Sequence, residues 1–225
     1  MCGRFAYFSA HEAMVRLFGL PDDTPEVEPR WNIAPTQFVP TVRVGADGRR
    51  RLSLLYWGLV PHWAREKAIG ARMINARAET VREKPSFRSA FRQRRCLVLA
   101  DGYYEWQATP DGKQPWFVRR ADREPFGMAG LWESWIETPG EPPLESCTIL
   151  TTEAVAPLDA IHHRVPVVLA ARDYERWLAT KPADLDALAA LLAPPTAGML
   201  EAMRVSRRVN NARNEGPGLI EPLAG

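Results

Sequence analysis

The order of apolar and polar residues along the chain predicts short strands joined by tight turns. Val39–Val44 and Arg51–Trp57 are rich in apolar residues, and Gly45-Ala46-Asp47-Gly48 between them is typical of a hairpin turn. Further strands, the third and fourth of which form a second hairpin, are predicted at Gly3–Phe8, Cys96–Ala100, Tyr103–Ala108, Pro115–Arg119, Phe126–Trp135, Cys147–Thr152 and Val165–Leu169.

Helices are predicted in smaller number and are mixed among the strands. Ser9, followed three residues later by Glu12, is typical of a helix N-cap, so we expect a helix from there to about Leu20. The other predicted helices are Ala76–Val81, Ser86–Arg92, Asp173–Leu178 and Leu185–Leu192. Strands and helices do not alternate strictly, which argues against a parallel sheet. We therefore expect an α+β fold, a single domain over residues 1–225 built on an antiparallel, barrel-like β-sheet flanked by short helices.

Composition is that of a globular protein. The chain has 225 residues, of which 46% are hydrophobic and 25% charged. Its apolar runs all fall short of the roughly 18–20 residues that a membrane helix needs. Charged residues interrupt the N-terminal region, which does not resemble a signal peptide. We expect a cytoplasmic protein with no membrane partner.

Cysteine and histidine spacing argues against disulfides and bound metal. The three cysteines are Cys2, Cys96 and Cys147, an odd and widely spaced set with no Cys-x-x-Cys pair. The four histidines show no spacing typical of a zinc site. We expect no metal and no cofactor.

Arginine dominates the basic residues and gathers in one segment. Of 29 basic residues 25 are arginine, a bias that a GC-rich genome would also produce. Residues 72–95, however, contain eight basic residues against two acidic ones on a chain of net charge +2. Arginine grips phosphate with a planar fork, so this segment is a candidate surface for a polyanion.

Cys2 is a candidate reaction centre because of its place in the chain. Initiator methionine is readily removed before a small residue, which would leave Cys2 with a free α-amine beside its thiol. The amine titrates at about 7.7–8.0 and the thiol at about 8.5, so both are usable near neutrality. Such an aminothiol traps aldehydes, first as an imine and then as a five-membered thiazolidine. The alternative is that Cys2 is an ordinary second residue.

Further polar and aromatic motifs lie beside the predicted strand ends. They are Met1-Cys2-Gly3-Arg4-Phe5, Trp31-Asn32-Ile33-Ala34-Pro35-Thr36, Trp57-Gly58-Leu59-Val60-Pro61-His62-Trp63, Ile74-Asn75-Ala76-Arg77-Ala78-Glu79-Thr80, Ala100-Asp101-Gly102-Tyr103-Tyr104-Glu105-Trp106, Ile161-His162-His163-Arg164-Val165-Pro166 and Val205-Ser206-Arg207-Arg208-Val209-Asn210. Together and in this order they resemble the SRAP family, the SOS response-associated peptidases that also crosslink to abasic sites in DNA. The resemblance spans nearly the whole chain.

The resemblance implies four catalytic residues. Cys2, exposed after autocatalytic loss of Met1, would attach to the ring-opened sugar of an abasic site, and the other site positions are Asn75, Glu105 and His162. Apolar neighbours favour the protonated form of a carboxylic acid such as Glu105, which can then supply protons to a departing hydroxyl. His162 can move protons near neutral pH, and the Ile-His-x-Arg pattern selects it over His163. The alternatives are a Glu105–arginine ion pair, a structural histidine, and Asn75 as a helix cap.

The resemblance also implies residues that bind DNA. Arg4, Arg77 and Arg164 adjoin the catalytic positions and suit phosphate contacts. Aromatic side chains stack on bases of single strands, which suggests this role for Trp63 and Trp106, although Trp106 also suits the core. Weaker candidates from the family pattern are Asn32 and Thr151. The expected partner is single-stranded DNA with abasic sites, with single-strand/double-strand junctions as a further candidate, and we expect a monomer.

We therefore expect an autopeptidase that removes Met1, crosslinks to abasic-site DNA and carries a candidate lyase activity. Three other functions stay open from the sequence. A glutamine amidotransferase or another N-terminal-nucleophile hydrolase also begins Met-Cys-Gly, but usually carries a second, synthetase domain. A peptidase acting on other proteins would need a peptide groove that no motif indicates. In a non-catalytic DNA-binding module the arginines would matter and Cys2 would not.

Overall fold

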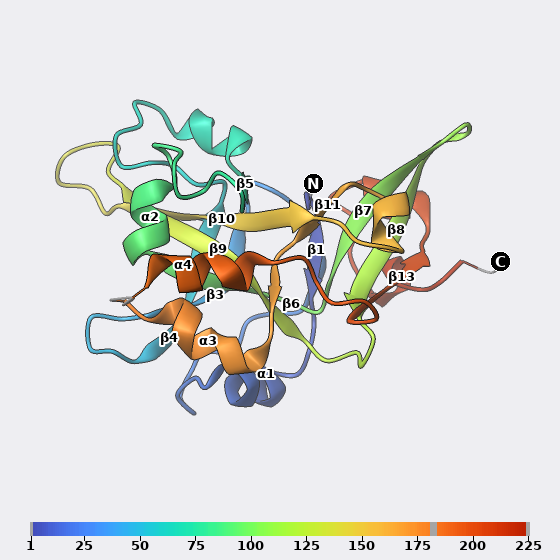
Figure 1. Ribbon diagram of the computed structural model, residues 1–225, viewed down its shortest axis with the longest axis horizontal. Helices are drawn as coiled ribbons and strands as arrows, with labels where there is room; N and C mark the ends of the chain where they lie inside the picture. The colour runs from blue at the N-terminus through green and yellow to red at the C-terminus, as the bar shows by residue number, and fades with distance from the viewer. Residues whose placement is uncertain (1, 181–183, 224–225) are drawn as a thin grey trace.

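The strands form two sheets in the structure, a computed structural model that describes residues 2–180 and 184–223 (Figure 1). The strands are β1 (Phe5–Tyr7), β2 (Arg30–Ile33), β3 (Phe38–Val44), β4 (Arg50–Trp57), β5 (Asn75–Arg77), β6 (Arg95–Ala100), β7 (Gly102–Thr109), β8 (Gly112–Arg120), β9 (Phe126–Trp135), β10 (Leu144–Glu153), β11 (Arg164–Pro166), β12 (Val168–Leu169) and β13 (Leu200–Arg204). The α-helices are α1 (His11–Phe18), α2 (Arg88–Gln93), α3 (Tyr174–Leu178) and α4 (Leu185–Ala189). Within the described ranges, none of these helices has the length and apolar character needed to cross a bilayer.

The larger sheet closes on itself as a barrel. Its closed path runs β10-β4-β3-β6-β9 and back to β10, since β10 pairs with both β4 and β9. Closure leaves these strands without free edges. The α+β, barrel-like prediction is confirmed, and most pairings are antiparallel as expected. β10 nevertheless runs parallel to β4 and β5, a pairing between distant segments that no local turn residue announces.

The hairpin predictions are confirmed. β3 and β4 pair from Phe38 with Tyr56 to Val44 with Arg50, around a turn in which Gly48 has φ 77°, a conformation that favours glycine. β7 and β8 form the second hairpin. The predicted strands at 96–100, 126–135 and 147–152 are present within wider limits. β2 and β13, which the apolar pattern did not predict, lie at the two edges of the smaller sheet, ordered β13-β8-β7-β1-β2.

The smaller sheet has a core on each face. Phe5 and Tyr103 belong to the main core, which the sheet shares with the barrel, and the Phe5 ring meets Trp57 of β4 with centroids 5.2 Å apart. Tyr104 belongs to a second cluster with Ala6, Phe117, Val205 and Val209. Successive strand residues point to opposite faces, so β7 sends alternate side chains into different surroundings.

The predicted N-cap at Ser9 is wrong. The helix begins at His11 behind Ala10, and no side chain caps it. The Ser9 hydroxyl instead donates to Asp101, which also accepts the backbone N–H groups of Phe8 and Ser9. A buried carboxylate outside the helix thus competes successfully for the hydroxyl that local spacing assigned to the cap.

The predicted helix at Ala76–Val81 is also wrong. Asn75–Arg77 is strand β5, paired in parallel with Ile149–Thr151 of β10, and turns follow it. Asn75 therefore caps no helix. Before β5, the backbone at Gly70 lies against that of Gly58, the residue that follows β4. The two approach so closely that a Cβ added at Gly70 would lie 2.5 Å from the Gly58 carbonyl oxygen.

Candidate active site around Cys2

The candidate site lies where the barrel meets the smaller sheet. β5 and β11 flank the C-terminal end of β10, with Ile149 opposite Asn75 and Glu153 opposite Arg164. β1 and β7 come from the smaller sheet, and Figure 1 shows them converging with β5 and β11. Cys2 lies three residues before Phe5, the first residue of β1, and is fully buried.

Asn75 holds the backbone of Cys2. Its Nδ2 donates to the Cys2 carbonyl oxygen at 2.7 Å. Its Oδ1 is buried and has no hydrogen-bond partner among the described residues. The sequence placed Asn75 in the site, and the structure brings it into direct contact with Cys2.

Burial and Glu105 together set the protonation of the Cys2 thiol. Burial raises the pKa of Cys2 far above its usual range, and the negative charge of Glu105 raises it further, while a hydrogen bond to the Arg4 backbone opposes both. Glu105 is only 4% exposed on β7. The thiol is therefore protonated at neutral pH, with a carboxyl group close enough to affect its charge.

His162, not His163, is the histidine of the site. Burial lowers the pKa of His162 and the charge of Glu105 opposes that shift. Its Nδ1 accepts the Arg164 backbone N–H at 2.9 Å, so the neutral ring carries its hydrogen on Nε2. The exposed His163 ring stacks on it with centroids 4.4 Å apart.

Two cavities border these residues. An open cavity of about 440 Å³ is lined by Arg4, Glu105, Trp106, Lys113, His162 and Asn210. A second, too small to hold a water molecule, is lined by Tyr103, Glu105, Val118, Leu158, Ile161, His162, Arg164 and Val165. Sequence reasoning missed Lys113, Asn210 and Tyr103 as lining residues. Asn210 ends the closing motif, Tyr103 lies in the Glu105 motif, and Lys113 carries no signal beyond its place after the hairpin turn.

Arg4 lines the open cavity and is anchored from behind. Its Nη1 donates to Asn32 Oδ1 at 2.7 Å and to the Val209 carbonyl at 2.9 Å, and its guanidinium lies 5.8 Å from the Trp106 ring centroid. Asn32 is fully buried and donates to the carbonyls of Asn211 and Asn214. Asn32 thus supports Arg4 and the C-terminal segment from below the surface, a placement that does not favour direct contact with DNA.

Arg164 and Thr151 are also buried beneath the site. The Arg164 guanidinium binds Glu79 in bidentate fashion, at 2.7 and 2.9 Å, and donates to the Thr151 carbonyl at 2.5 Å. Arg164 is 6% exposed and Thr151 fully buried. This geometry favours a structural role for both over the DNA contacts predicted for them.

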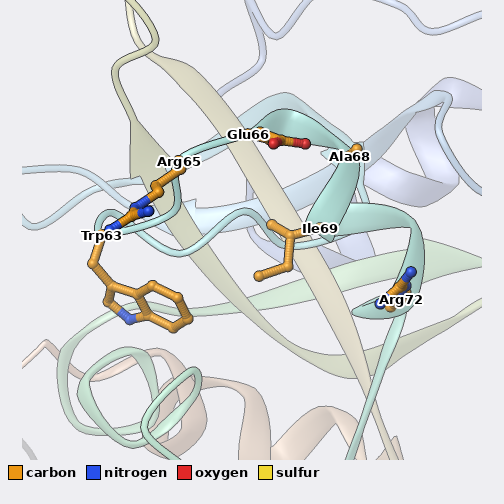
Figure 2. A pocket seen from close by; sticks show the side chains of 6 residues that line it. All are labelled: Trp63, Arg65, Glu66, Ala68, Ile69 and Arg72. Atoms are coloured by element: carbon orange, nitrogen blue, oxygen red, sulfur yellow. The ribbon is translucent and has the colours of Figure 1, made fainter.

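Arg77 and the two tryptophans are accessible. Arg77 is exposed on β5, and Trp106 is half-buried with its Nε1 donating to Asn210 Oδ1 at 2.8 Å. Trp63 is 50% exposed at a separate cavity of about 420 Å³, which Figure 2 shows between its indole and the side chains of Ile69 and Arg72. The structure therefore divides the predicted DNA-binding residues into exposed and buried groups.

The basic segment at 72–95 is less available than its charge suggests. Arg94 pairs with Glu133, and Arg82 pairs with Asp186. Arg95 is 3% exposed and donates to the carbonyls of Phe91 and Trp177. At least Arg94 and Arg95 serve the fold, so the polyanion surface is smaller than expected.

Comparisons with known proteins agree with one another. A family model described as "SOS response associated peptidase (SRAP)" matches residues 1–212. The chain is 42% identical over 224 residues to the abasic site processing protein YoqW of Bacillus subtilis, covering 98% of this chain and 99% of that one. It is 33% identical to the abasic site processing protein YedK of Escherichia coli, covering 99% and 100%. A solved protein structure from Bacteroides thetaiotaomicron, 23% identical, superposes with a TM-score of 0.87 over 99% of this chain and 100% of that one, which shows the same fold.

Proposed function

The chain belongs to the SOS response associated peptidase (SRAP) family, and from this premise we propose that it processes abasic sites in single-stranded DNA through Cys2. The observation that carries the proposal is the buried contact of Cys2 with Asn75, beside the carboxylate of Glu105, which influences both the Cys2 thiol and the His162 ring. Curated relatives that match almost end to end are named abasic site processing proteins.

Removal of Met1 is the first step. Hydrolysis of the Met1–Cys2 peptide bond consumes one water, releases methionine and leaves Cys2 with an α-amine. Asn75 keeps the Cys2 carbonyl in place, so the new amine forms at a fixed position. The buried Oδ1 of Asn75, which has no hydrogen-bond partner among residues 2–180 and 184–223, is a suitable acceptor for that amine.

Capture of the abasic site follows in two stages. The amine adds to the aldehyde of the ring-opened sugar, and loss of the resulting hydroxyl as water gives an imine. The thiol then adds across the C=N bond, its proton passes to the nitrogen, and a thiazolidine results. One water is released overall, and nothing is oxidised or reduced.

Glu105 and His162 move the protons of these steps. The departing hydroxyl needs a proton, and both residues line the open cavity in which the sugar would lie. The Nε2–H of neutral His162 can donate while its Nδ1 stays bonded to the Arg164 amide. A protonated thiol also suits the order of events, since the amine and not the sulfur attacks first.

Exposed cationic and aromatic residues hold the DNA strand. Arg4 faces the cavity and Arg77 lies at the end of β5, where both can meet phosphates. Trp106 borders the same cavity and can stack on a base next to the abasic site, while Trp63 can stack on a more distant one.

A crosslinking assay tests the proposal. Purified protein is incubated with single-stranded DNA containing one abasic site, and complexes that survive denaturation are counted on a gel. We expect wild type to form the complex, with intact mass lacking Met1. Cys2→Ala should form none while retaining weak, salt-sensitive binding.

Cys147→Ala is the matched control, because Cys147 is another fully buried cysteine, located in the barrel strand β10. It should crosslink at the wild-type level. Crosslinking by Cys2→Ala at the wild-type rate would exclude Cys2 as the reacting residue, and absence of a complex with wild type would exclude the function.

A further inference from the structure

Tyr103 lies on the face of β7 that points toward Cys2. Tyr103 and Glu105 are two residues apart on the strand and so share a face, whereas Tyr104 points to the other side. The Cα partner of Tyr103 in β1 is Phe5, three residues after Cys2. Tyr103 packs in the main core that includes Cys2, and Tyr104 packs in the second cluster.

The Tyr103 hydroxyl is buried and has no hydrogen-bond partner within the part of the chain that the structure describes. Tyr103 also lines the small cavity shared with Glu105 and His162, which is too small to hold a water molecule. Burying a hydroxyl without a partner lowers stability, and a Phe side chain would fill the same space without that cost. The stability of the fold therefore gives no reason for a hydroxyl at this position, which suggests that the hydroxyl serves the function of the site.

Cys2 and Glu105 both influence the ionisation of this hydroxyl. Burial raises the pKa of Tyr103 well above its usual range, and negative charge on Cys2 or Glu105 raises it further. The phenol therefore stays protonated throughout the neutral range, and it can donate to an anion that forms beside it.

We propose that the Tyr103 hydroxyl donates a hydrogen bond to the Cys2 sulfur when that sulfur gains negative charge, and so acts as a further catalytic residue. Tyr103 keeps its proton throughout, while the sulfur attacks the imine carbon and the thiol proton passes to the imine nitrogen. A buried thiolate needs hydrogen-bond donors, and the Arg4 backbone N–H already donates to the Cys2 sulfur. The substrate in this step rests on the proposed function, but the proposed hydrogen bond from the Tyr103 phenol to the charged Cys2 sulfur does not.

The reactivity of Cys2 with iodoacetamide tests the proposed hydrogen bond between Tyr103 and the Cys2 sulfur without DNA. The rate of alkylation at Cys2 is followed by peptide mass spectrometry, which separates it from Cys96 and Cys147, between about pH 6 and 10. Hydrogen bonds to charged groups typically change such equilibria about 10- to 100-fold. Tyr103→Phe should therefore slow alkylation at neutral pH by about 10- to 100-fold and move the profile to higher pH.

Other groups that titrate or carry charge around the sulfur are common to all variants. They are Arg4 just before β1, Glu105 on β7, His162 with its neighbour His163, and Arg164 on β11. Their contributions cancel when profiles of variants are compared with wild type, so a shift specific to Tyr103→Phe reports the phenol.

Tyr104→Phe is the matched control, with the same chemical change one residue away. The Tyr104 hydroxyl donates to the Trp31 carbonyl at 2.7 Å. Its loss should lower the melting temperature and leave the alkylation profile unchanged. Tyr103→Phe should show the opposite pattern, a shifted profile with a melting temperature equal to or above that of wild type.

An unchanged profile in Tyr103→Phe would overturn the proposal. A melting temperature below that of Tyr104→Phe, or failure to fold, would also overturn it, because the hydroxyl would then have a structural partner. A further outcome is that wild type fails to crosslink abasic-site DNA while Tyr103→Phe still shifts the alkylation profile. In that case the proposed function is wrong and the proposed hydrogen bond between Tyr103 and Cys2 is supported.

Discussion

Two buried glutamates, Glu133 on β9 and Glu105 on β7, lie near opposite ends of β10, and their neighbours differ in a way that separates a stabilising polar cluster from the proposed active site. Glu133 lies opposite Ser146 near the start of β10 and is 3% exposed. It accepts Arg94 Nε at 2.8 Å and also binds Arg94 Nη2, and its other oxygen lies 3.5 Å from His62 Nδ1. Its charge is thus neutralised by a neighbouring side chain, as burial of a carboxylate requires.

Glu105, near the other end of β10, has different neighbours. It is as buried as Glu133, but the groups around it include a thiol, a histidine, and two polar atoms without partners in the described chain, Asn75 Oδ1 and Tyr103 Oη. Folded proteins rarely leave buried polar atoms unpaired. Around Cys2, therefore, some buried polar atoms have no hydrogen-bond partner among the described residues, whereas both oxygens of Glu133 are bound by Arg94 or lie near His62.

The cysteines repeat this contrast. Burial raises the pKa of Cys96 to about 12 and that of Cys147 above its usual range, as it does for Cys2. Cys96 packs so closely that a Cβ added at Gly130 would lie 2.9 Å from its sulfur. Burial therefore does not distinguish Cys2 from the other two cysteines, whereas its polar neighbours do.

The largest expected effect is on the rate of crosslinking. Glu105→Gln keeps the side-chain shape but removes the proton-transferring group, which typically contributes about 10²- to 10⁴-fold. We expect the single-turnover crosslinking rate to fall by that factor, measured by quenching the reaction with abasic-site DNA at short times.

Glu133→Gln is its counterpart at the other end of β10. It should crosslink at the wild-type rate but lose about 3 kcal/mol of unfolding free energy in urea, because Arg94 would be left without its carboxylate. The contrast between the two ends fails if both variants slow crosslinking equally while they are folded.

A smaller effect should separate two arginines that the sequence treated alike. Arg77→Met should weaken binding to intact single-stranded DNA and reduce the slope of log affinity against log salt by about 0.7, the loss of one phosphate contact. Its unfolding free energy should stay within about 0.5 kcal/mol of wild type.

Arg164→Met should do the reverse. Loss of the Arg164 pair with Glu79, whose side chain is 44% exposed, should cost about 1–2 kcal/mol of unfolding free energy and leave the salt slope unchanged. Fluorescence titrations at several salt concentrations, with urea unfolding, measure both quantities. A reduced salt slope in Arg164→Met would restore it as a phosphate contact.

The sequence predicted the local features of this molecule better than the distant ones. Gly48 and its neighbours specify the β3–β4 turn by themselves, and the apolar runs of β6, β9 and β10 identify buried strands. By contrast, the parallel pairing of β10 with β5 depends on tertiary packing, and it replaced the helix predicted at Ala76–Val81.

In the candidate site, too, local features were predicted better than contacts between residues far apart in the sequence. The motifs singled out Asn75, Glu105 and His162, and the structure brings Asn75 into contact with Cys2, with Glu105 close enough to influence both the Cys2 thiol and His162. Whether an arginine is exposed or buried depends on a partner far away in sequence. Glu79 lies 85 residues from Arg164, and adjacency in the motif could not reveal that pair.

The smallest expected effect is a pH dependence of stability from His162. Burial lowers its pKa in the folded state, so below about pH 6.5 the unfolded chain binds a proton that the folded chain resists, and stability falls as pH falls. His162→Asn removes this contribution. Because the ring is only half-buried and screened by solvent, the variant should lose about 1 °C less than wild type between about pH 7.5 and 5.5. Thermal melts at both pH values measure the difference, with the exposed neighbour variant His163→Asn expected to follow wild type. Equal losses of melting temperature in all three proteins would mean that His162 resists protonation no more than a surface histidine. The cluster around Cys2 would then lack the desolvated histidine that distinguishes it from the cluster around Glu133.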